Sequence, residues 1–141
     1  MVTHHGKYGM INMHSWMFLS SFERLRKNIL NNQFIDNLIH LGPRTFDELS
    51  GEVVQNTAFV ITKAVYNNTS SSFYRLISGD NCNAKRELFL KKLYKPILIK
   101  QDIFKSIEGA SIFYHFSETK LSIHTHPKKL SCDAVSFQGI I

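Results

Sequence analysis

The chain has 141 residues, of which 43% are hydrophobic and 20% are charged. These proportions are ordinary for a globular protein and argue against a disordered chain or a coiled coil. The formal net charge of +6 favours a polyanionic partner such as nucleic acid over an acidic small substrate. The lysines are scattered along the chain, however, so each one taken singly is more simply explained as solvated surface.

The two cysteines, Cys82 and Cys132, are far apart in the sequence and form neither a disulfide framework nor a zinc-binding pattern. Reduced thiols are therefore expected. The N-terminal residues lack the pattern of a signal peptide, and no run approaches the roughly 20 apolar residues that span a bilayer. The sequence thus predicts a cytoplasmic protein with no membrane partner.

A strand and a helix are expected in the first quarter of the chain. Residues 8–14 are a short, mostly apolar run, which is typical of a central strand buried on both faces. Ser20 and Glu23 have the spacing of a capping box, so a helix should begin there and end near residues 31–32. Its predicted apolar stripe consists of Phe22, Leu25 and Ile29, and its solvated face carries Glu23 and Lys27 at ion-pair spacing.

Two further strands are expected at residues 35–41, which end at Gly42-Pro43, and at residues 53–61. The order strand, helix, strand, loop, strand predicts an α/β protein. Residues 73–77 alternate well enough to form a strand that could pair with residues 60–66 as a hairpin.

The remaining segments give weaker predictions. Residues 83–94 are expected to form a basic amphipathic helix, capped by Asn83 and ended by Pro96. Its predicted apolar side consists of Leu88, Leu90, Leu93 and Tyr94. Residues 102–107 could form a helical turn, and residues 112–116 a short strand or helix.

Few residues suggest chemistry by themselves. His124, His126 and Cys132 could be drawn as zinc ligands, but a fourth ligand and a known ligand spacing are missing. His14 and His40 each lie at the carboxyl end of a predicted parallel strand, where α/β proteins bind ligands, although a histidine there is more often a hydrogen-bonded core residue. No Gly-rich phosphate loop or nucleophile elbow can be drawn. Taken alone, these residues define a basic α/β domain without a specific activity.

A longer stretch is more specific. From residue 6 the chain reads Gly-Lys-Tyr-Gly-Met-Ile-Asn-Met-His-Ser-Trp-Met-Phe, and Leu41-Gly42, Phe46 and Val-Gln-Asn-Thr-Ala-Phe-Val-Ile at 54–61 follow. This pattern strongly resembles the second half of the catalytic domain of adenine-specific DNA methyltransferases. Within that group it is similar to the large methyltransferases of BREX phage-defence systems, the PglX-like family. The resemblance covers residues 6–141 and is densest over 6–63.

The resemblance implies a fold and a domain division. The chain would be a fragment of a Rossmann-like S-adenosylmethionine-dependent methyltransferase sheet, made of its distal strands and helices and followed by an irregular α+β extension. Residues 1–66 are then the distal half of the catalytic domain. Residues 67–141 are a connecting segment that leads toward a target-recognition domain.

The resemblance also implies an activity for the parent enzyme. That activity is methyl transfer from S-adenosylmethionine to N6 of an adenine flipped out of double-stranded DNA, in phage defence or restriction-modification. The family's Gly-rich cofactor motif and Asn-Pro-Pro-Tyr motif precede the matched segment, and the sequence contains neither. We therefore expect this chain to be inactive alone, and it is assigned no catalytic, cofactor-binding or metal-binding residue.

One site residue carries over from the family. Phe46 matches the motif that supplies an aromatic ring to stack on the flipped adenine, and an aromatic side chain in a polar turn suits that role. Packing of Phe46 under the turn is the alternative for this residue.

The expected partners are double-stranded DNA, the upstream half of the methyltransferase and other defence-system subunits. The alternative function is a non-catalytic basic α/β module that binds DNA or a partner chain. Because a piece of a sheet exposes backbone edges and apolar faces, the isolated chain is expected to aggregate or to be only partly ordered.

Overall fold

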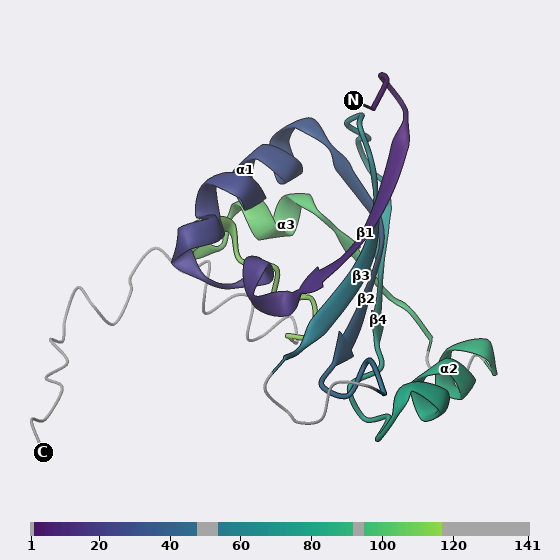
Figure 1. Ribbon diagram of the computed structural model, residues 1–141. Helices are drawn as coiled ribbons and strands as arrows, with labels where there is room; N and C mark the ends of the chain where they lie inside the picture. The colour runs from purple at the N-terminus through teal and green to yellow at the C-terminus, as the bar shows by residue number, and fades with distance from the viewer. Residues whose placement is uncertain (1, 48–53, 92–94, 117–141) are drawn as a thin grey trace, which may run out of the picture.

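The computed structural model describes residues 2–47, 54–91 and 95–116. These residues form a five-stranded sheet with two helices on one side and a third at a corner of the other (Figure 1). The strands are β1 (Lys7–Met13), β2 (Phe34–Gly42), β3 (Asn56–Thr62), β4 (Ser70–Arg75) and β5 (Ile97–Lys100). The helices are α1 (Glu23–Asn32), α2 (Cys82–Leu90) and α3 (Asp102–Lys105), with short 3-10 turns at His14–Met17, Ser20–Phe22 and Glu108–Ala110. Along the described ranges, no helix is long and apolar enough to cross a membrane.

The sheet is mixed, with the strand order β1-β3-β2-β4-β5. β3 is antiparallel to both β1 and β2, whereas β4 is parallel to β2 and antiparallel to β5. β1, β2 and β4 therefore run in one direction, and their carboxyl ends meet at the same edge of the sheet. The predicted α/β class is confirmed. β1, which ends just before His14, and β2, which contains His40, do run in the same direction, but the antiparallel strand β3 lies between them.

The hairpin expected between residues 60–66 and 73–77 is wrong. β4 begins earlier, at Ser70, and pairs with β2 and β5 instead of β3. The β2–β4 register places Leu38 beside Phe73, and both side chains are fully buried. Local sequence order favours a hairpin, whereas burial of these two apolar residues favours the parallel pair.

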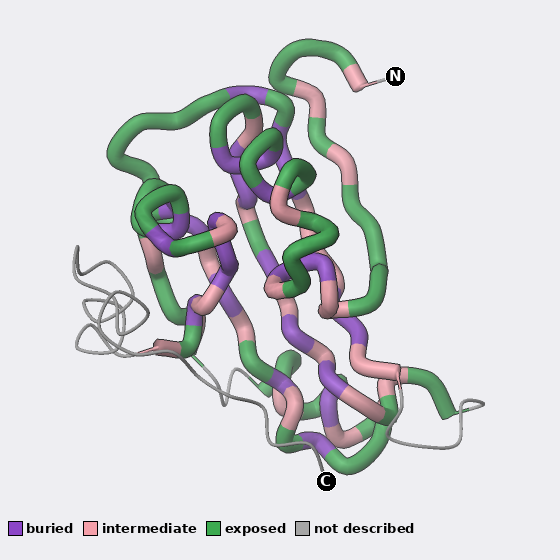
Figure 2. Tube along the Cα trace, turned by 90° about the vertical axis from the view of Figure 1, so that its left-hand side faces the viewer, coloured by how far each residue is buried: buried purple, intermediate pink, exposed green. Residues whose placement is uncertain are grey.

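β1 is confirmed as a strand, but the expectation of a central strand buried on both faces is wrong. β1 lies at the edge of the described sheet, with β3 as its neighbour, and only Tyr8 along it is half-buried (Figure 2). Its apolar residues Met10, Ile11 and Met13 are 49%, 56% and 49% exposed. An apolar run shows that a strand suits burial, but it does not show which element covers the strand.

One face of the sheet, which we call the covered face, packs against α1, α3 and the 3-10 turns (Figure 1). The opposite face, which we call the open face, has α2 at one corner (Figure 1). The core lies between the covered face and its helices, and it consists of Trp16, Met17, Ile29, Leu30, Ile35, Leu38, Ile61, Phe73, Phe104, Ile107, Ala110, Ile112 and Tyr114. β4 and α3, which follow residue 66, thus share the core of the earlier elements. The functional division at residue 66 stays a prediction.

Helix α1 begins and ends where the sequence predicts, but the predicted capping box does not form. Ser20 lies in a 3-10 turn, Phe22 precedes the helix without a side-chain cap, and Glu23 pairs with Lys27 along the helix surface. The Glu23–Lys27 ion pair is therefore confirmed. Since its carboxylate is held by Lys27, Glu23 does not reach back to Ser20.

The predicted apolar stripe of α1 is only partly correct. Ile29 is buried, but Phe22 and Leu25 are 37% and 44% exposed. Arg26 takes the buried position, and its guanidinium donates hydrogen bonds to the carbonyl oxygens of Trp16, Leu19 and Gly109 at 2.7–2.9 Å. A guanidinium can satisfy several carbonyls at once, so a charged side chain connects α1 to two distant turns.

Helix α2 is shorter than predicted and is capped differently. Asn81, rather than Asn83, accepts a hydrogen bond from the backbone of Ala84 at 2.8 Å. Leu90, predicted on the apolar side, is 62% exposed, and Lys85 is the buried residue of the helix. The Lys85 ammonium donates to the carbonyl oxygens of Leu76 and Gly79.

Three other expectations concern the remaining segments. The helical turn at 102–107 is confirmed as α3. The strand or helix expected at 112–116 is wrong, because these residues form a loop and a turn. Leu93, Tyr94 and the start of the strand predicted at 53–61 lie outside the described residues, although β3 itself is confirmed.

Candidate functional site

Phe46 lies on a short turn that follows β2 at the carboxyl edge of the sheet. The turn begins at Gly42, whose φ of +71° is strained for other residues. A Cβ at this position would also lie 2.8 Å from the side chain of Ile77. The Thr45 hydroxyl donates to the Gly42 carbonyl oxygen at 2.9 Å and closes the turn. This arrangement leaves Phe46 43% exposed.

Phe46 lines a hollow of about 310 Å³ between the open face and α2. Its lining is mostly apolar and consists of Ile11, Ile39, Leu41, Thr45, Phe46, Leu76, Cys82, Lys85, Arg86 and Phe89. A second aromatic ring, that of Phe89 on α2, is 42% exposed in the same hollow. An apolar hollow with aromatic and cationic side chains can receive a flat aromatic group that is attached to an anion.

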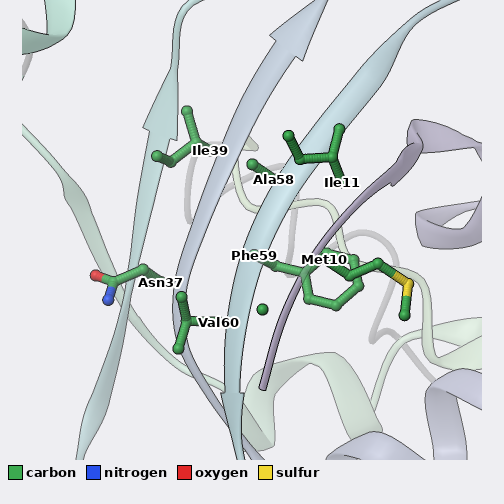
Figure 3. Close-up of a pocket in the computed structure, with 8 residues that line it drawn as sticks. Met10, Ile11, Asn37, Ile39, Ala58, Phe59 and Val60 are labelled. Atoms are coloured by element: carbon green, nitrogen blue, oxygen red, sulfur yellow. The ribbon is translucent and has the colours of Figure 1, made fainter. Parts of the chain in front are cut away.

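A second hollow of about 300 Å³ adjoins the first on the sheet itself. Figure 3 shows Ile11, Ala58 and Ile39 on three neighbouring strands along this hollow. Ile11 and Ile39 line both hollows, so the two form one continuous apolar surface on the open face. Among the residues that line the second hollow, only Asn37 has a polar side chain.

A chain of hydrogen bonds lies at the carboxyl ends of the strands, on the covered side. Nδ1 of His14, directly after β1, is 3.0 Å from Nε2 of His40 near the end of β2. Nδ1 of His40 is 2.8 Å from the hydroxyl of Tyr114, and the positive charge of Arg75 on β4 acts on this phenol. Three residues from distant parts of the sequence, His14, His40 and Tyr114, therefore form one polar chain.

Burial sets the ionisation of this chain. Desolvation, together with the positive potential of His14, Arg75, His115 and Lys85, lowers the pKa of His40 to about 4. Desolvation also lowers the pKa of His14 and raises the pKa of Tyr114 above its ordinary value. Both imidazoles and the phenol are thus neutral at neutral pH.

Aromatic rings surround the histidine pair. Phe18 meets the His14 ring edge-on at 5.6 Å between centroids and stacks on Phe113 at 5.6 Å. Tyr114 stacks on Phe73 of the core at 5.1 Å with an interplanar angle of 7°. The tyrosine is therefore fixed by packing as well as by its hydrogen bond.

The sequence identified His14 and His40 separately, but it gave no indication that they touch each other or Tyr114. The zinc candidates His124, His126 and Cys132 lie outside the described residues. Among residues 2–47, 54–91 and 95–116, no group of three or more His, Cys, Asp or Glu residues could hold a metal ion. Tyr114 lies among aromatic residues shortly after the turn at Glu108–Ala110, and this pattern is the signal that could have suggested a buried hydroxyl.

S-adenosylmethionine needs a backbone cradle that leaves room for the ligand. Gly42 and Gly79, two glycines beside the hollow that Phe46 lines, do not form one. A Cβ at Gly42 would lie 2.8 Å from Ile77, and a Cβ at Gly79 would lie 2.7 Å from Lys85, so side chains of this chain fill both spaces. These residues do not fit the cofactor by themselves, and we assign no step of its chemistry to them.

Comparisons with known proteins give two close relatives in sequence. The adenine-specific methyltransferase PglX of Lacticaseibacillus casei (strain Zhang) is 40% identical over 123 residues, which cover 84% of this chain and 10% of that protein. The adenine-specific methyltransferase BrxX of Escherichia coli O9:H4 (strain HS) is 41% identical over 111 residues, which cover 77% of this chain and 9% of that protein. The chain thus spans about a tenth of the length of these relatives. No protein-family model matches it.

Among solved structures, one comes from work on the complex assembly and conformational transition of the type I R-M system. It covers 52% of this chain and 15% of its own chain, with 19% sequence identity and a TM-score of 0.42.

Proposed function

Because this chain is homologous to a segment of the PglX-like adenine-specific methyltransferases, as its sequence predicts, we propose that it is the distal part of the catalytic domain of such an enzyme. The parent enzyme would transfer a methyl group from S-adenosylmethionine to N6 of adenine in DNA, in BREX or restriction-modification defence. The observation that carries the proposal is the identity of 40% over 84% of the chain. We expect this chain alone to be inactive, since it lacks the cofactor and Asn-Pro-Pro-Tyr motifs.

In this proposal Phe46 stacks on the adenine that the enzyme flips out of the duplex. Its exposure, its position on a closed turn at the carboxyl edge of the sheet and the apolar hollow beside it support this role. Base stacking on an aromatic face contributes ~1–3 kcal/mol and tolerates any orientation of the base edge. Phe46 would therefore hold the extruded base while other residues of the parent enzyme perform the transfer.

Double-stranded DNA is the proposed partner of the parent enzyme. The formal charge of +6 supports phosphate contacts, and Arg86 is an exposed cation beside the hollow that Phe46 lines. The upstream half of the methyltransferase is the second proposed partner. The exposed apolar residues of β1 support that contact.

A non-catalytic module remains the second candidate function. The open face, with Ile11 56% exposed and Leu98 64% exposed, favours it because such a surface can bind a partner chain without any catalysis. The two candidates differ in what Phe46 does. In an enzyme it contacts the base, and in a binding module it packs against the partner.

The experiment compares Phe46→Ala, Phe46→Leu and Phe46→Trp in a full-length methyltransferase that contains this segment. Phe46→Ala should lower methylation by roughly 5- to 150-fold, which corresponds to the ~1–3 kcal/mol of stacking, and should leave duplex affinity nearly unchanged. Phe46→Trp should retain more activity than Phe46→Leu, because the π-face is the functional part.

The matched control is Phe22→Ala, which removes a similarly exposed aromatic ring, 37% exposed, in a 3-10 turn before α1. This variant should methylate normally. If Leu at position 46 restores activity as well as Trp does, or if the Ala variant unfolds, Phe46 is a packing residue and the stacking role is wrong.

A further inference from the structure

The polar chain of Tyr114, His40 and His14 has a definite hydrogen-bond direction, which the complete burial of Tyr114 sets. The Tyr114 hydroxyl donates to Nδ1 of His40, which leaves the proton of His40 on Nε2. Nε2 of His40 donates in turn to Nδ1 of His14, so the proton of His14 lies on its Nε2.

The opposite direction leaves a buried donor without an acceptor. If His40 donated from Nδ1 to Tyr114, the Tyr114 hydroxyl proton would need another acceptor. Tyr114 is 0% exposed, so water is not an acceptor, and its hydroxyl has no hydrogen-bond partner besides His40 among the described residues. The nearby guanidinium of Arg75 cannot accept a hydrogen bond. A buried hydroxyl proton without an acceptor is unfavourable, and this fixes the first direction.

The series of hydrogen bonds ends at the Nε2–H group of His14, for which the described residues supply no acceptor. Nδ1 of His14 is paired with His40, and Nε2 has no hydrogen-bond partner among the described residues. His14 is half-buried, follows β1 directly, and has the ring of Phe18 beside it. It therefore offers a donor at the edge of the sheet where α/β proteins bind ligands.

The chemistry around His14 favours a neutral acceptor. A phosphate would favour the imidazolium form, but burial lowers the pKa of His14, and His40 beside it is neutral. The other charged or titratable groups around the pair, Arg75, His115 and Lys85, further disfavour a positive charge there. A ring nitrogen of a base, next to the aromatic ring of Phe18, fits a neutral donor better.

From this geometry we infer that Nε2 of His14 donates a hydrogen bond to a ring nitrogen of the adenine extruded from the DNA, with His40 and Tyr114 as positioning residues. The inference rests on the proposed function, because it requires an extruded adenine at the carboxyl ends of the strands. Enzymes of this kind read a flipped base by its hydrogen-bonding edge as well as by stacking. His14 would supply an edge contact that Phe46 cannot.

The experiment uses a full-length methyltransferase that contains this segment, with its recognition sequence read from methylated adenines in host DNA. Duplexes carry adenine, 1-deazaadenine, 3-deazaadenine or 7-deazaadenine at the target, each analogue lacking one ring nitrogen but keeping the N6 amine. The wild-type kcat/KM should fall about tenfold on one analogue. His14→Ala should lower kcat/KM on adenine to a similar extent and no longer distinguish adenine from that analogue.

His14→Gln is the second variant, because its amide keeps an N–H donor and should recover part of the discrimination. Thermal melting of both variants separates loss of the contact from loss of the fold. If His14→Ala loses activity equally on all four bases, or methylates like wild type, the inference is overturned. If the loss instead disappears when the phosphate beside the target is a methylphosphonate, His14 contacts phosphate and the base assignment is wrong.

The positioning role has a separate spectroscopic test on the 141-residue chain carrying Ile11→Thr, a substitution that should keep the chain monomeric because Ile11 is 56% exposed on the edge strand. Long-range ¹H–¹⁵N spectra of this variant should show His14 with its proton on Nε2, and adding Tyr114→Phe should turn this into a mixture of tautomers while the ring stays stacked on Phe73. A proton on Nδ1 of His14 in the presence of Tyr114 would overturn the inference. An enzyme that methylates no adenine at all would instead overturn the proposed function.

Discussion

The two faces of the sheet differ in how fully other elements of the chain bury them. On the covered face Leu38, Ile61 and Phe73 are 0% exposed under α1, α3 and the 3-10 turns, and Arg26 connects these elements through backbone carbonyls. On the open face α2 covers one corner, and Ile11 remains 56% exposed. The covered face therefore holds the fold together, whereas the open face is suited to a partner.

The two edges of the described sheet repeat this difference. β5 has only four residues, begins directly after Pro96 and ends on Lys100, which are features that protect an edge from pairing with another chain. β1 has seven residues, begins with Lys7 and then exposes Met10, Ile11 and Met13. The unprotected edge and the exposed residue Ile11 of the open face thus belong to the same strand.

Two neighbouring residues on β2 test whether the covered face contributes more to stability than the open face. Leu38 is fully buried in the core, whereas Ile39 lines the hollows of the open face. Leu38→Ala should lower the free energy of unfolding by about 2–5 kcal/mol, because it leaves a cavity in a closed core. Ile39→Ala should cost about 1 kcal/mol, since its site is already open on one side.

Pulse proteolysis in urea at submicromolar concentration measures both variants while limiting self-association. Two equal losses of stability would mean that the open face is packed as tightly as the covered face. In that case the comparison between the faces would be wrong.

The sequence predicts where helices and strands begin and end better than it predicts which of them pack or pair with one another. β1, α1, β2, β3 and α3 lie where local patterns place them, because periodicity and turn residues act over a few positions. The pairing of β4 with β2 depends on burial of Leu38 beside Phe73, which are 35 residues apart, and no local pattern contains that information. The edge position of β1 is missed for the same reason.

The polar residues of the core and site are harder to predict. Arg26 and Lys85 lie on helices, where charged side chains are usually solvated, yet both cations are buried against carbonyl oxygens from outside their helices. His14 and His40 are recognised one by one, but their contact forms across β3, which lies between their strands, and the sequence does not show that strand order. Phe46 comes from family resemblance alone, and its role stays a prediction.

The second test concerns pH and the covered face. The folded pKa of His40 is about 4, against 6.5 for a free histidine, so the unfolded state binds more protons between these values. Stability should therefore be complete above pH 6.5 and should fall by at most roughly 3 kcal/mol as the pH drops toward 4. The lowered pKa of His14 acts in the same direction.

Urea midpoints at pH 7.5 and 4.5 measure this loss of stability. His40→Gln is the control, because its amide keeps hydrogen-bonding groups but does not titrate, and carboxylates contribute equally to both proteins. A wild-type chain that loses no more stability than His40→Gln would show that His40 is hydrated and that the covered face is open at this end.

The smallest expected change in stability comes from the open face. Ile11→Thr replaces an exposed β-branched residue by a polar one of similar strand preference, so the free energy of unfolding should change by less than about 0.5 kcal/mol. Association should change far more, because Ile11 lines both hollows and lies on the unprotected edge strand. Sedimentation velocity of the wild-type chain should show large assemblies, and the variant should shift toward monomer. Leu25→Thr, on the solvent side of α1 and 44% exposed, is the matched control and should leave the assemblies unchanged. If Leu25→Thr disperses them equally, general surface hydrophobicity drives association, and the open face has no special part in it.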